Sequence, residues 1–461
     1  MTIVMGVDTS TQSTKSLLVD AETGEVLESA AAPHPVGTEV DPRAWTAAFD
    51  SSGAALLPRA EAVSVAGQQH GMVALDSAGE PVRDALLWND TRSAQAALDL
   101  IEEMGGPAAC AEVTGSVMVA SITASKLRWM RDHEPENAAR TASVLLPHDY
   151  LSAHLAAPGT EPFTDAGDAS GTGYFATALG EWRPDLAANA LGHEVALPRI
   201  AGPGAVAART AAGQVVGAGT GDNAGAALGL ALRPGDVLLS VGTSGVASTV
   251  SAAPLADPTG TVTGFADAQG GFLPMVTTIN AARILDLQAA WLGVDVHGLA
   301  DLALSSAPGA GGVTLSPYYG GERSPNRPDA VGTWTGLRST TTRADLARAA
   351  FEALACSLAD AAEQLQALTG QEAGRVLLVG GATRSPALQQ ILPAVLGRPV
   401  ELPPPGEYVA RGAARQAAWA LSGAATPPDW PMPGLKVLDA APTPGVREAY
   451  LELKEATATW A

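Results

Sequence analysis

Short apolar and polar blocks alternate at the beginning of the chain. The apolar run 3–7 predicts a buried strand, the hydroxyl-rich segment 8–14 predicts a turn, and the apolar segments 16–20 and 26–28 predict two further strands. Three short strands joined by polar turns form an antiparallel meander. The first turn therefore places several polar side chains at the end of a strand.

The same strand–turn–strand pattern returns near the middle of the chain, over residues 237–250. A repeat with a period of half the chain favours two similar domains related by internal duplication. The segment 233–236, Arg-Pro-Gly-Asp, comes just before the second copy and has the composition of a boundary loop. We therefore predict an N-terminal domain over 1–232 and a C-terminal domain over 233–461.

A long amphipathic helix is the clearest element of the second half. Apolar residues recur at steps of three and four from Leu346 to Leu368, which predicts a helix that begins at Arg343. Thr342 can cap its N-terminus, and Gly370 lies where a C-terminal stop is expected. The pattern then alternates between strands and helices, predicted over 375–379, 385–396, 400–402 and 410–421. Each half therefore combines a β-meander with α/β elements.

Composition narrows the class of protein. The length of 461 residues suits two to three domains, 46% of the residues are hydrophobic, and the formal net charge is −21. So acidic a chain disfavours nucleic acids and anionic membranes as partners, because both are polyanions. Two cysteines make no disulfide framework and no four-cysteine zinc site, which indicates a reducing, cytoplasmic setting. No secretory signal is expected, and no apolar run approaches the roughly 20 residues that cross a bilayer.

Two polar turns are candidates for phosphate binding. The chain has no P-loop, the glycine-rich loop that ends in Gly-Lys-Ser or Gly-Lys-Thr, so a P-loop enzyme is excluded. The segments Thr11-Gln12-Ser13 and Gly242-Thr243-Ser244 instead offer backbone N–H groups and hydroxyls at tight turns, an arrangement that binds anions. Each turn alone is also compatible with an ordinary β-hairpin. Their occurrence once in each half favours a nucleotide held between two domains.

The glycine-rich segment 217–221 leads into Asp222, and a helical apolar run follows it. Asp222 therefore either caps the helix or presents a carboxylate that can take a proton from a substrate hydroxyl. A dinucleotide-binding loop is disfavoured, because the glycine spacing is not GxGxxG and no acidic strand end follows about 20 residues later. Asp222 is thus a candidate general base, and Asn223 beside it is a candidate substrate contact.

Other polar or small residues lie at predicted strand ends. Gln69 and His70 lie between glycines after the predicted strand 62–65, which suits a polyhydroxy ligand or, for the histidine, a local structural partner. Trp88 can offer an apolar face to a sugar, although an aromatic residue at this position is also typical of a core. Two further segments suit either a flat ligand or close backbone packing, namely Gly380-Gly381-Ala382 and the helix around Gly412.

Two longer motifs resemble the signatures of a known family. The segment 121–133, Ser-Ile-Thr-Ala-Ser-Lys-Leu-Arg-Trp-Met-Arg-Asp-His, is similar to the first signature of the FGGY carbohydrate kinases, and 332–337, Gly-Thr-Trp-Thr-Gly-Leu, is similar to the second. The resemblance covers nearly the whole chain. This family is a branch of the actin/hexokinase/Hsp70 ATPase superfamily. The resemblance therefore implies an α/β fold of two actin-like (ribonuclease H-like) ATPase domains, with mixed β-sheets flanked by helices and a central cleft.

Within the family, the sugar-site segments most resemble those of the kinases that act on xylulose. These segments are 67–71, 85–92, 165–172 and 317–325. Glycerol kinases are expected to carry Asn-Gln-Arg-Glu over 68–71, and the xylulose-specific pattern usually has Met where Gln69 stands. The resemblance implies ATP-dependent phosphorylation of D-xylulose to D-xylulose 5-phosphate. A kinase for another ketose or polyol and a non-catalytic actin-fold ATP-binding protein are the alternatives.

The resemblance also implies a role for each candidate residue. Asp222 matches the catalytic base, Gln69 and His70 match a pair that binds the substrate, and Asp8 matches a residue near the metal ion. The positions that match the ATP site are the first phosphate turn (Asp8, Thr11, Gln12, Ser13), the second phosphate turn (Gly242, Thr243, Ser244) and the adenosine segment (Gly380, Gly381, Ala382), with Gly412 nearby. The expected ligands are therefore ATP, Mg²⁺ and a small sugar. A homodimer is a further expectation, because relatives commonly form dimers.

Overall fold

The computed structural model describes residues 1–371 and 374–460, which divide between two compact units. Unit 1 comprises Met1–Leu232, Ser251–Leu273 and Gly406–Pro431, and unit 2 comprises Arg233–Val250, Pro274–Pro405 and Met432–Ala461. The first junction coincides with the domain boundary predicted at residues 232 and 233. Two later segments return to unit 1, and the second of them contains α14 (Tyr408–Ser422), which packs on the sheet of that unit. Continuous domains over 1–232 and 233–461 therefore differ from the compact units in these two segments.

Unit 1 is built on a mixed sheet with the strand order β13-β14-β5-β1-β2-β3, and β15 pairs with the end of β5. The strands are β1 (Ile3–Thr9), β2 (Ser13–Asp20), β3 (Val26–Pro33), β5 (Ala62–Gly67), β13 (Ala208–Arg209), β14 (Val215–Val216) and β15 (Thr220–Gly221). The antiparallel pairing of β1 with β2 and of β2 with β3 confirms the predicted meander. Strands β1 and β2 extend into the predicted turn, which is reduced to residues 10–12.

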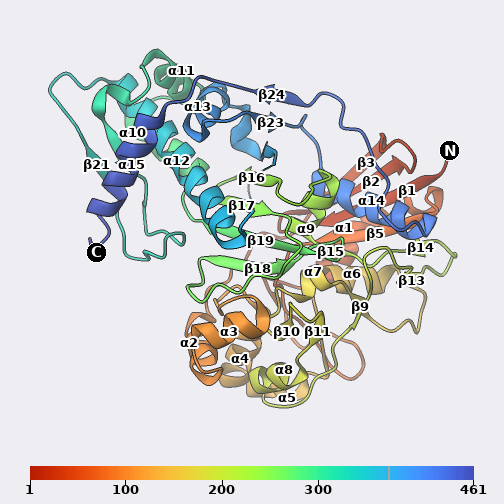
Figure 1. Ribbon diagram of the computed structural model, residues 1–461. Helices are drawn as coiled ribbons and strands as arrows, with labels where there is room; N and C mark the ends of the chain where they lie inside the picture. Colours follow the sequence, from red (N-terminus) through yellow and green to blue (C-terminus); the bar gives the residue numbers. More distant parts are fainter. Residues whose placement is uncertain (372–373, 461) are drawn as a thin grey trace. The chain divides into compact units, whose positions relative to one another are not determined.

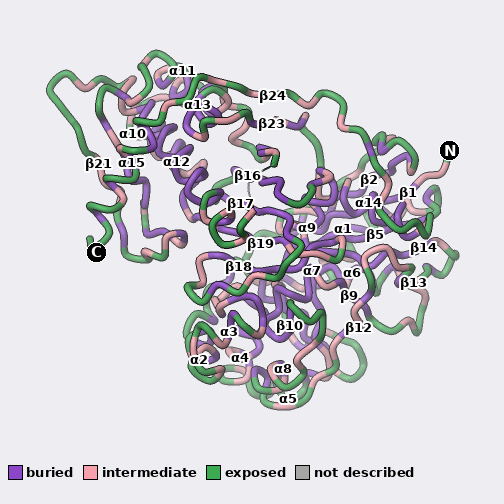
Figure 2. Tube along the Cα trace, viewed as in Figure 1, coloured by how far each residue is buried: buried purple, intermediate pink, exposed green. Residues whose placement is uncertain are grey.

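Both faces of this sheet are covered. Alternate residues of a strand point to opposite faces, so Val4 and Leu17 pack with the alanines of α14 on one side. Met5 and Leu18 pack on the other side with Phe49 of α1 (Arg43–Ser52) and with α6 (Pro147–Leu155). The central strands β1 and β5 are therefore buried on both faces, as the purple trace along them shows (Figure 2). This rigid sheet carries Asp8 near the end of β1.

A helical group completes unit 1, with α2, α3, α4, α5 and α8 gathered together (Figure 1). These helices surround a core that includes Leu127, Met130 and Tyr174. Their bounds are α2 (Ala94–Glu103), α3 (Pro107–Thr114), α4 (Thr123–His133), α5 (Pro135–Arg140) and α8 (Pro184–Leu191). The short elements of unit 1 are β4 (Glu39–Val40), η1 (Leu57–Arg59), β6 (Val73–Leu75), β7 (Ala85–Leu86), β8 (Ser143–Leu145), β9 (Phe163–Thr164), α7 (Ala166–Ala169), β10 (Phe175–Ala176), β11 (Glu181–Trp182), β12 (Arg199–Ile200), α9 (Asp222–Gly229) and β18 (Val262–Ala266).

Unit 2 repeats the plan of the first sheet. Its strands follow the order β19-β17-β16-β22-β23-β24, with β16 antiparallel to β17 and parallel to β22. The bounds are β16 (Val237–Val241), β17 (Gly245–Thr249), β19 (Phe272–Thr278), β22 (Val376–Val379), β23 (Val400–Leu402) and β24 (Lys436–Leu438). Each of these strands corresponds, in its place along the sheet and in its direction, to one strand of unit 1. The pairs are β24 with β13, β23 with β14, β22 with β5, β16 with β1, β17 with β2, and β19 with β3. This agreement in order and direction is what an internal duplication predicts.

The long helix predicted in the second half is α12 (Arg343–Thr369), and it is buried along most of its length (Figure 2). Thr342 and Asp345 form a capping box at its N-terminus, and Gly370 ends it in the left-handed conformation at φ +67°. Both predicted helix ends are confirmed. The remaining elements of unit 2 are α10 (Ala282–Leu292), α11 (Val296–Ser305), η2 (Ala310–Gly312), β20 (Thr314–Ser316), β21 (Thr333–Thr335), η3 (Gly381–Arg384), α13 (Pro386–Leu396) and α15 (Pro444–Ala456).

The helices that the structure describes include none that combines the length and the apolar character needed to span a lipid bilayer.

Candidate active site

Asp222 and the Gln69–His70 pair follow two neighbouring parallel strands. β15 pairs with the end of β5, with Thr220 opposite Ala66 and Gly221 opposite Gly67. The carboxyl ends of parallel strands lie at one edge of a sheet, where ligands of α/β proteins commonly bind. The backbone therefore brings the two predicted site segments together, although they are far apart in the sequence.

Asp222 is the first residue of α9 rather than its cap. Gly221 holds the N-cap position, and no side chain caps this helix end. The Asp222 carboxylate accepts hydrogen bonds from the Asn223 N–H at 2.8 Å and from Asn223 Nδ2 at 2.9 Å. Burial raises the pKa of Asp222 to about 6, and the Asn223 hydrogen bonds oppose that rise. A carboxyl group with such a pKa is ionised near neutral pH yet basic enough to accept a proton, which suits a general base.

Gln69 connects the two segments directly. Its side chain is buried, and its Oε1 accepts a hydrogen bond from Asn223 Nδ2 at 3.1 Å. A Cβ at Gly221 would come within 2.7 Å of the Gln69 side chain, so only glycine leaves room for this contact. The predicted site residues Gln69, Asn223 and Asp222 therefore form one hydrogen-bonded chain.

His70 has a left-handed backbone with φ +69°. Its ring Nδ1 lies 2.7 Å from the Gly171 carbonyl oxygen, and its ring centroid lies 5.5 Å from that of Phe265. Because a carbonyl only accepts, Nδ1 carries the proton in the neutral ring, and Nε2 is the acceptor nitrogen. His70 thus has the structural partner that the sequence left open, and an acceptor nitrogen for a hydroxyl group.

Trp88 is tied to the first predicted phosphate turn and does not lie in a core. The residue is 46% exposed, and its indole Nε1 donates to Thr11 Oγ1 at 2.9 Å. Thr11 in turn donates to Gln68 Oε1 at 3.4 Å. The turn, the loop after β5 and the exposed indole ring therefore lie together in unit 1.

Asp8 near the end of β1 is almost fully buried, at 4% exposure. Burial, reinforced by the nearby Asp222 carboxylate, raises the pKa of Asp8 to about 7. Within the described residues, Asp8 Oδ1 accepts no hydrogen bond. A buried carboxylate oxygen without a donor, close to a second carboxylate, suits a divalent cation, and Mg²⁺ is commonly held by one or two carboxylates and phosphate oxygens. The residues present therefore fit the expected metal, although the described part of the chain has no cluster of three or more His, Cys, Asp or Glu ligands.

The two predicted phosphate turns are hairpins. The first, around Gln12, is closed by a hydrogen bond from Ser10 N to the Ser13 carbonyl at 3.1 Å. The second joins β16 to β17, is exposed, and is closed by Gly242 N donating to the Ser244 carbonyl at 3.0 Å. Each turn thus has the hairpin geometry that sequence left as the alternative to a phosphate site. Each also presents hydroxyl side chains, from Ser13 in unit 1 and from Thr243 and Ser244 in unit 2.

In unit 2, Gly380 approaches the base of the second turn. It has φ +101°, and a Cβ there would lie 2.5 Å from the Val241 carbonyl oxygen. The next residue, Gly381, has open space where a Cβ would be, and it begins η3 together with Ala382. The segment predicted to contact adenosine therefore lies beside the second phosphate turn within the same unit.

Gly412 lies in α14 of unit 1 at a close helix crossing. A Cβ at this position would lie 1.9 Å from the Gly225 carbonyl oxygen of α9. This is the packing alternative that the sequence left open. A contact of Gly412 with adenosine stays a prediction.

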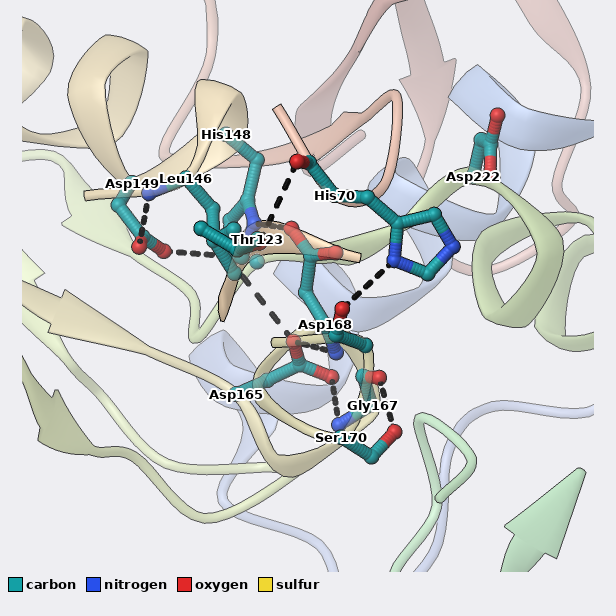
Figure 3. Close-up of polar contacts among 12 residues, drawn as sticks. His70, Thr123, Leu146, His148, Asp149, Asp165, Gly167, Asp168, Ser170 and Asp222 are labelled. Carbon is teal, nitrogen blue, oxygen red and sulfur yellow. Dashed lines mark hydrogen bonds and ion pairs between the residues drawn. The ribbon is translucent and has the colours of Figure 1, made fainter. Parts of the chain in front are cut away.

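A buried polar cluster was missed by the sequence reasoning. His148 Nδ1 lies 2.6 Å from Asp168 Oδ2, and His148 Nε2 lies 3.2 Å from Asp149 Oδ1 (Figure 3). Asp165 caps α7 by accepting from the N–H groups of Gly167 and Asp168. Burial raises the pKa of Asp149 to about 7, that of Asp165 to about 6, and that of Asp168 well above its usual value. The only signal in the sequence was the Asp165-Ala-Gly-Asp168 spacing, and nothing marked His148.

Comparison with known proteins identifies the family. The model of the N-terminal domain of the FGGY family of carbohydrate kinases matches residues 3–229, and that of the C-terminal domain matches residues 237–421. The chain belongs to the FGGY family of carbohydrate kinases. It is therefore a sugar kinase, and the resemblance seen in the two signature motifs is confirmed.

Relatives in this family include xylulose kinases. The chain is 46% identical over 459 residues to the xylulose kinase of Streptomyces coelicolor, which covers 95% of this chain and 92% of that protein. It is 34% identical to the xylulose kinase of Escherichia coli, covering 90% and 89%. The crystal structure of a xylulose kinase from Bifidobacterium adolescentis matches with a TM-score of 0.93 at 43% identity, covering 98% of this chain and 99% of that one. The fold is thus the two-domain actin-like fold of the FGGY kinases, as expected.

Proposed function

We propose that the protein transfers the γ-phosphoryl group of ATP to the terminal hydroxyl of D-xylulose, giving D-xylulose 5-phosphate and ADP. The observation that carries this proposal is the chain Gln69–Asn223–Asp222, which ends in a carboxyl group with a pKa of about 6 beside the predicted sugar loop. The high similarity to xylulose kinases over nearly the whole chain supports the choice of sugar.

In the proposed reaction, Asp222 orients the sugar hydroxyl and accepts its proton as the new O–P bond forms. The bond from the γ-phosphorus to the bridging oxygen breaks, and ADP leaves with that electron pair. Such transfers depend on positioning and charge stabilisation more than on covalent chemistry by the protein. His70 Nε2 would accept a hydrogen bond from another hydroxyl of the sugar, and the exposed Trp88 ring would cover an apolar face.

The proposed ATP contacts are those that the family resemblance implies. The turn Thr11–Ser13 and the turn Gly242–Ser244 would bind phosphate oxygens, and the segment Gly380–Ala382 would lie against adenosine, with Gly412 as a further predicted contact. Asp8 would hold the magnesium ion, whose chemistry is to neutralise charge on the phosphate oxygens. The net charge of −21 leaves this role to amides, hydroxyls and the metal rather than to a lysine-rich pocket.

Two further predictions accompany the function. Cys110 and Cys356 are both free and buried, which supports the prediction of a reducing, cytoplasmic location. The homodimer inferred from the family also stays a prediction.

The proposal is tested with Asp222→Asn in a coupled assay of ADP release with D-xylulose and Mg²⁺-ATP. We expect the substitution to lower kcat by roughly 10²–10⁴-fold, the usual contribution of a general base, without loss of the fold. Asp286→Asn, which changes an exposed aspartate of α10, is the matched control and should retain full turnover. Near-normal turnover of Asp222→Asn would remove Asp222 from the proposed role.

Gln69 favours a second candidate, a kinase of this family for another ketose or polyol. Gln69 stands where the xylulose-specific pattern usually has Met, and its side-chain amide oxygen accepts a hydrogen bond from Asn223. A panel of pentuloses, pentitols, glycerol and gluconate decides between the candidates by kcat/KM. Hydrolysis of ATP that is independent of every sugar, with no sugar phosphate formed, would contradict both candidates.

A further inference from the structure

Lys126 is a fully buried lysine on α4, with 0% of its surface exposed. Its Nζ donates to the carbonyl oxygen of His70 at 3.0 Å and to the carbonyl oxygen of Ser121. In the described part of the chain, no ion pair joins it to a carboxylate. Burial therefore lowers the pKa of Lys126 to about 7, and the more distant Asp90 charge opposes this only in part.

A buried ammonium group without a carboxylate partner destabilises a folded protein. An apolar side chain of similar length would fill the same space without that cost. The position of Lys126 is therefore better explained by what its Nζ contacts than by the stability of α4. One of its two acceptors, Ser121, lies in the segment that leads directly into α4. The other is the backbone carbonyl of His70, which belongs to a distant loop.

The backbone of His70 needs such a contact. His70 has φ +69°, a conformation that costs free energy for a residue with a Cβ. Its carbonyl oxygen receives Lys126 Nζ and, at 3.3 Å, Thr123 Oγ1, both from the first turn of α4 (Figure 3 shows the Thr123 contact). Whether charged or neutral, the Lys126 amine has N–H groups that can donate to this carbonyl. These donors hold the carbonyl in the direction that the left-handed backbone requires.

The ring of His70 is fixed from the opposite side. Its Nδ1 donates to the Gly171 carbonyl at 2.7 Å, and a Cβ at Gly171 would lie 2.6 Å from the same nitrogen. The residue is thus held at its carbonyl by α4 and at its ring by the segment after α7. With the carbonyl and Nδ1 both held, the direction of Nε2 is determined.

We propose that Lys126 is a positioning residue for substrate binding, which holds the His70 backbone so that the ring meets a hydroxyl of the sugar. This inference depends on the proposed function in one respect, namely the identity of the sugar that binds. The ammonium group acts through the His70 carbonyl and does not touch the sugar. Because the contact acts on His70, the predicted sugar contact, we expect its loss to affect the sugar and not the nucleotide.

The test is Lys126→Met, which keeps the length of the side chain and removes the donor. The matched control is Ser125→Ala on the same turn of α4, whose hydroxyl donates at 2.9 Å to the Val119 carbonyl and not to His70. We expect the KM for D-xylulose to rise about tenfold or more in Lys126→Met, since a misplacement of about 1 Å in a site can cost 10²-fold. The KM for ATP should not change, and the denaturation midpoint should stay the same or rise. An unchanged KM for the sugar would overturn the proposal.

A second readout needs no turnover. The His70 ring gives a Cε1–H signal in NMR, which is assigned by its loss in His70→Gln. Lys126→Met should shift or broaden this signal, whereas Ser125→Ala should leave it in place. An unmoved His70 signal in Lys126→Met would overturn the positioning role of Lys126 even if activity fell. If the unaltered protein does not turn over D-xylulose but the NMR effect is present, the proposed substrate is contradicted and the positioning role stays supported.

Discussion

Gln69 and Asn223 are joined by a hydrogen bond of 3.1 Å from Asn223 Nδ2 to Gln69 Oε1. The same amide nitrogen donates to Asp222 Oδ1 at 2.9 Å. Gln69 therefore fixes which way the Asn223 amide faces, and Asn223 in turn stabilises the ionised form of Asp222. A residue of the sugar loop thus acts on the electrostatics of the proposed base.

Substitution Gln69→Met should shift the acid limb of the kcat/KM profile to higher pH. Without the Gln69 acceptor, the Asn223 amide is free to turn away from Asp222, and a carboxylate that loses a donor has a higher pKa. The base then loses its charge at a higher pH, so activity at pH 6 falls more than activity at pH 8. Gln95→Met on the exposed surface of α2 is the control. Superimposable profiles of Gln69→Met and the unaltered protein would contradict the link.

The unaltered protein should itself show an acid limb near pH 6. Burial raises the pKa of Asp222 to about 6, so its carboxylate is increasingly protonated as the pH falls below that value. Since only the ionised form accepts the hydroxyl proton, kcat/KM should fall about tenfold per pH unit well below 6 and level off above 7. The measurement is the pH dependence of kcat/KM for the sugar at saturating Mg²⁺-ATP. The residual activity of Asp222→Asn should lack this limb, and a limb of unchanged position in that variant would assign it to another group.

Asp8→Asn should weaken magnesium binding and so raise the magnesium concentration that turnover requires. Asp8 is buried, its Oδ1 has no hydrogen-bond donor among the residues described, and its pKa is raised to about 7. A bound cation would give this oxygen a partner and lower that pKa. We expect the Mg²⁺ concentration for half-maximal turnover to rise about tenfold or more, because an amide is a weaker ligand than a carboxylate for this ion. Asp20→Asn, at the end of the neighbouring strand β2, is the control, since Asp20 accepts from turn N–H groups. An unchanged Mg²⁺ requirement in Asp8→Asn would show that the metal is held elsewhere.

Local patterns predicted the parts of the fold whose causes are local. The hairpins β1–β2 and β16–β17 follow from apolar runs around polar turns, and α12 follows from its 3.6-residue period and its caps Thr342 and Gly370. Asp222 and Gln69 were found because they lie at strand ends near glycines, and Trp88 because it follows a predicted strand. The common neighbourhood of Asp222 and Gln69 follows from the parallel pairing of β5 and β15.

Features that depend on distant contacts were not predictable in this way. Lys126 is a charged signature residue on the buried side of α4, and its contact with the His70 carbonyl, 56 positions away, was not readable from local pattern. The return of α14 to unit 1 depends on backbone fit, since a Cβ at Gly6 would lie 1.9 Å from the Ala410 carbonyl oxygen. A duplication pattern contains no information about such a fit. His148 and its carboxyl partners were missed for the same reason.

The cluster around His148 leads to a prediction about stability. Asp149, Asp165 and Asp168 surround one histidine with almost no exposed surface, so ionising all three would leave uncompensated buried charge. Burial accordingly raises the pKa of Asp149 to about 7. A carboxyl group with a raised folded pKa binds more protons when folded than when unfolded between about pH 4 and pH 7. Its contribution to stability is therefore present at low pH and is lost as the pH rises through 7.

Asp149→Asn should remove this loss of folding stability at higher pH. The asparagine keeps the shape of the protonated acid, its oxygen can still accept from Leu146 N, and its amide can donate to His148 Nε2, which lies 3.2 Å from the present Oδ1. The difference in the free energy of unfolding, variant minus unaltered protein, should grow by up to about 1.4 kcal/mol per pH unit between pH 4 and 7. Urea midpoints followed by circular dichroism at pH 5, 6, 7 and 8 measure it. Asp50→Asn is the matched control, because Asp50 contacts His154 at 2.9 Å on the surface, where its substitution should shift the midpoint little at any pH. Parallel midpoint curves for Asp149→Asn and the unaltered protein would mean that Asp149 is already ionised in the folded state, and that the cluster balances its charge in another way.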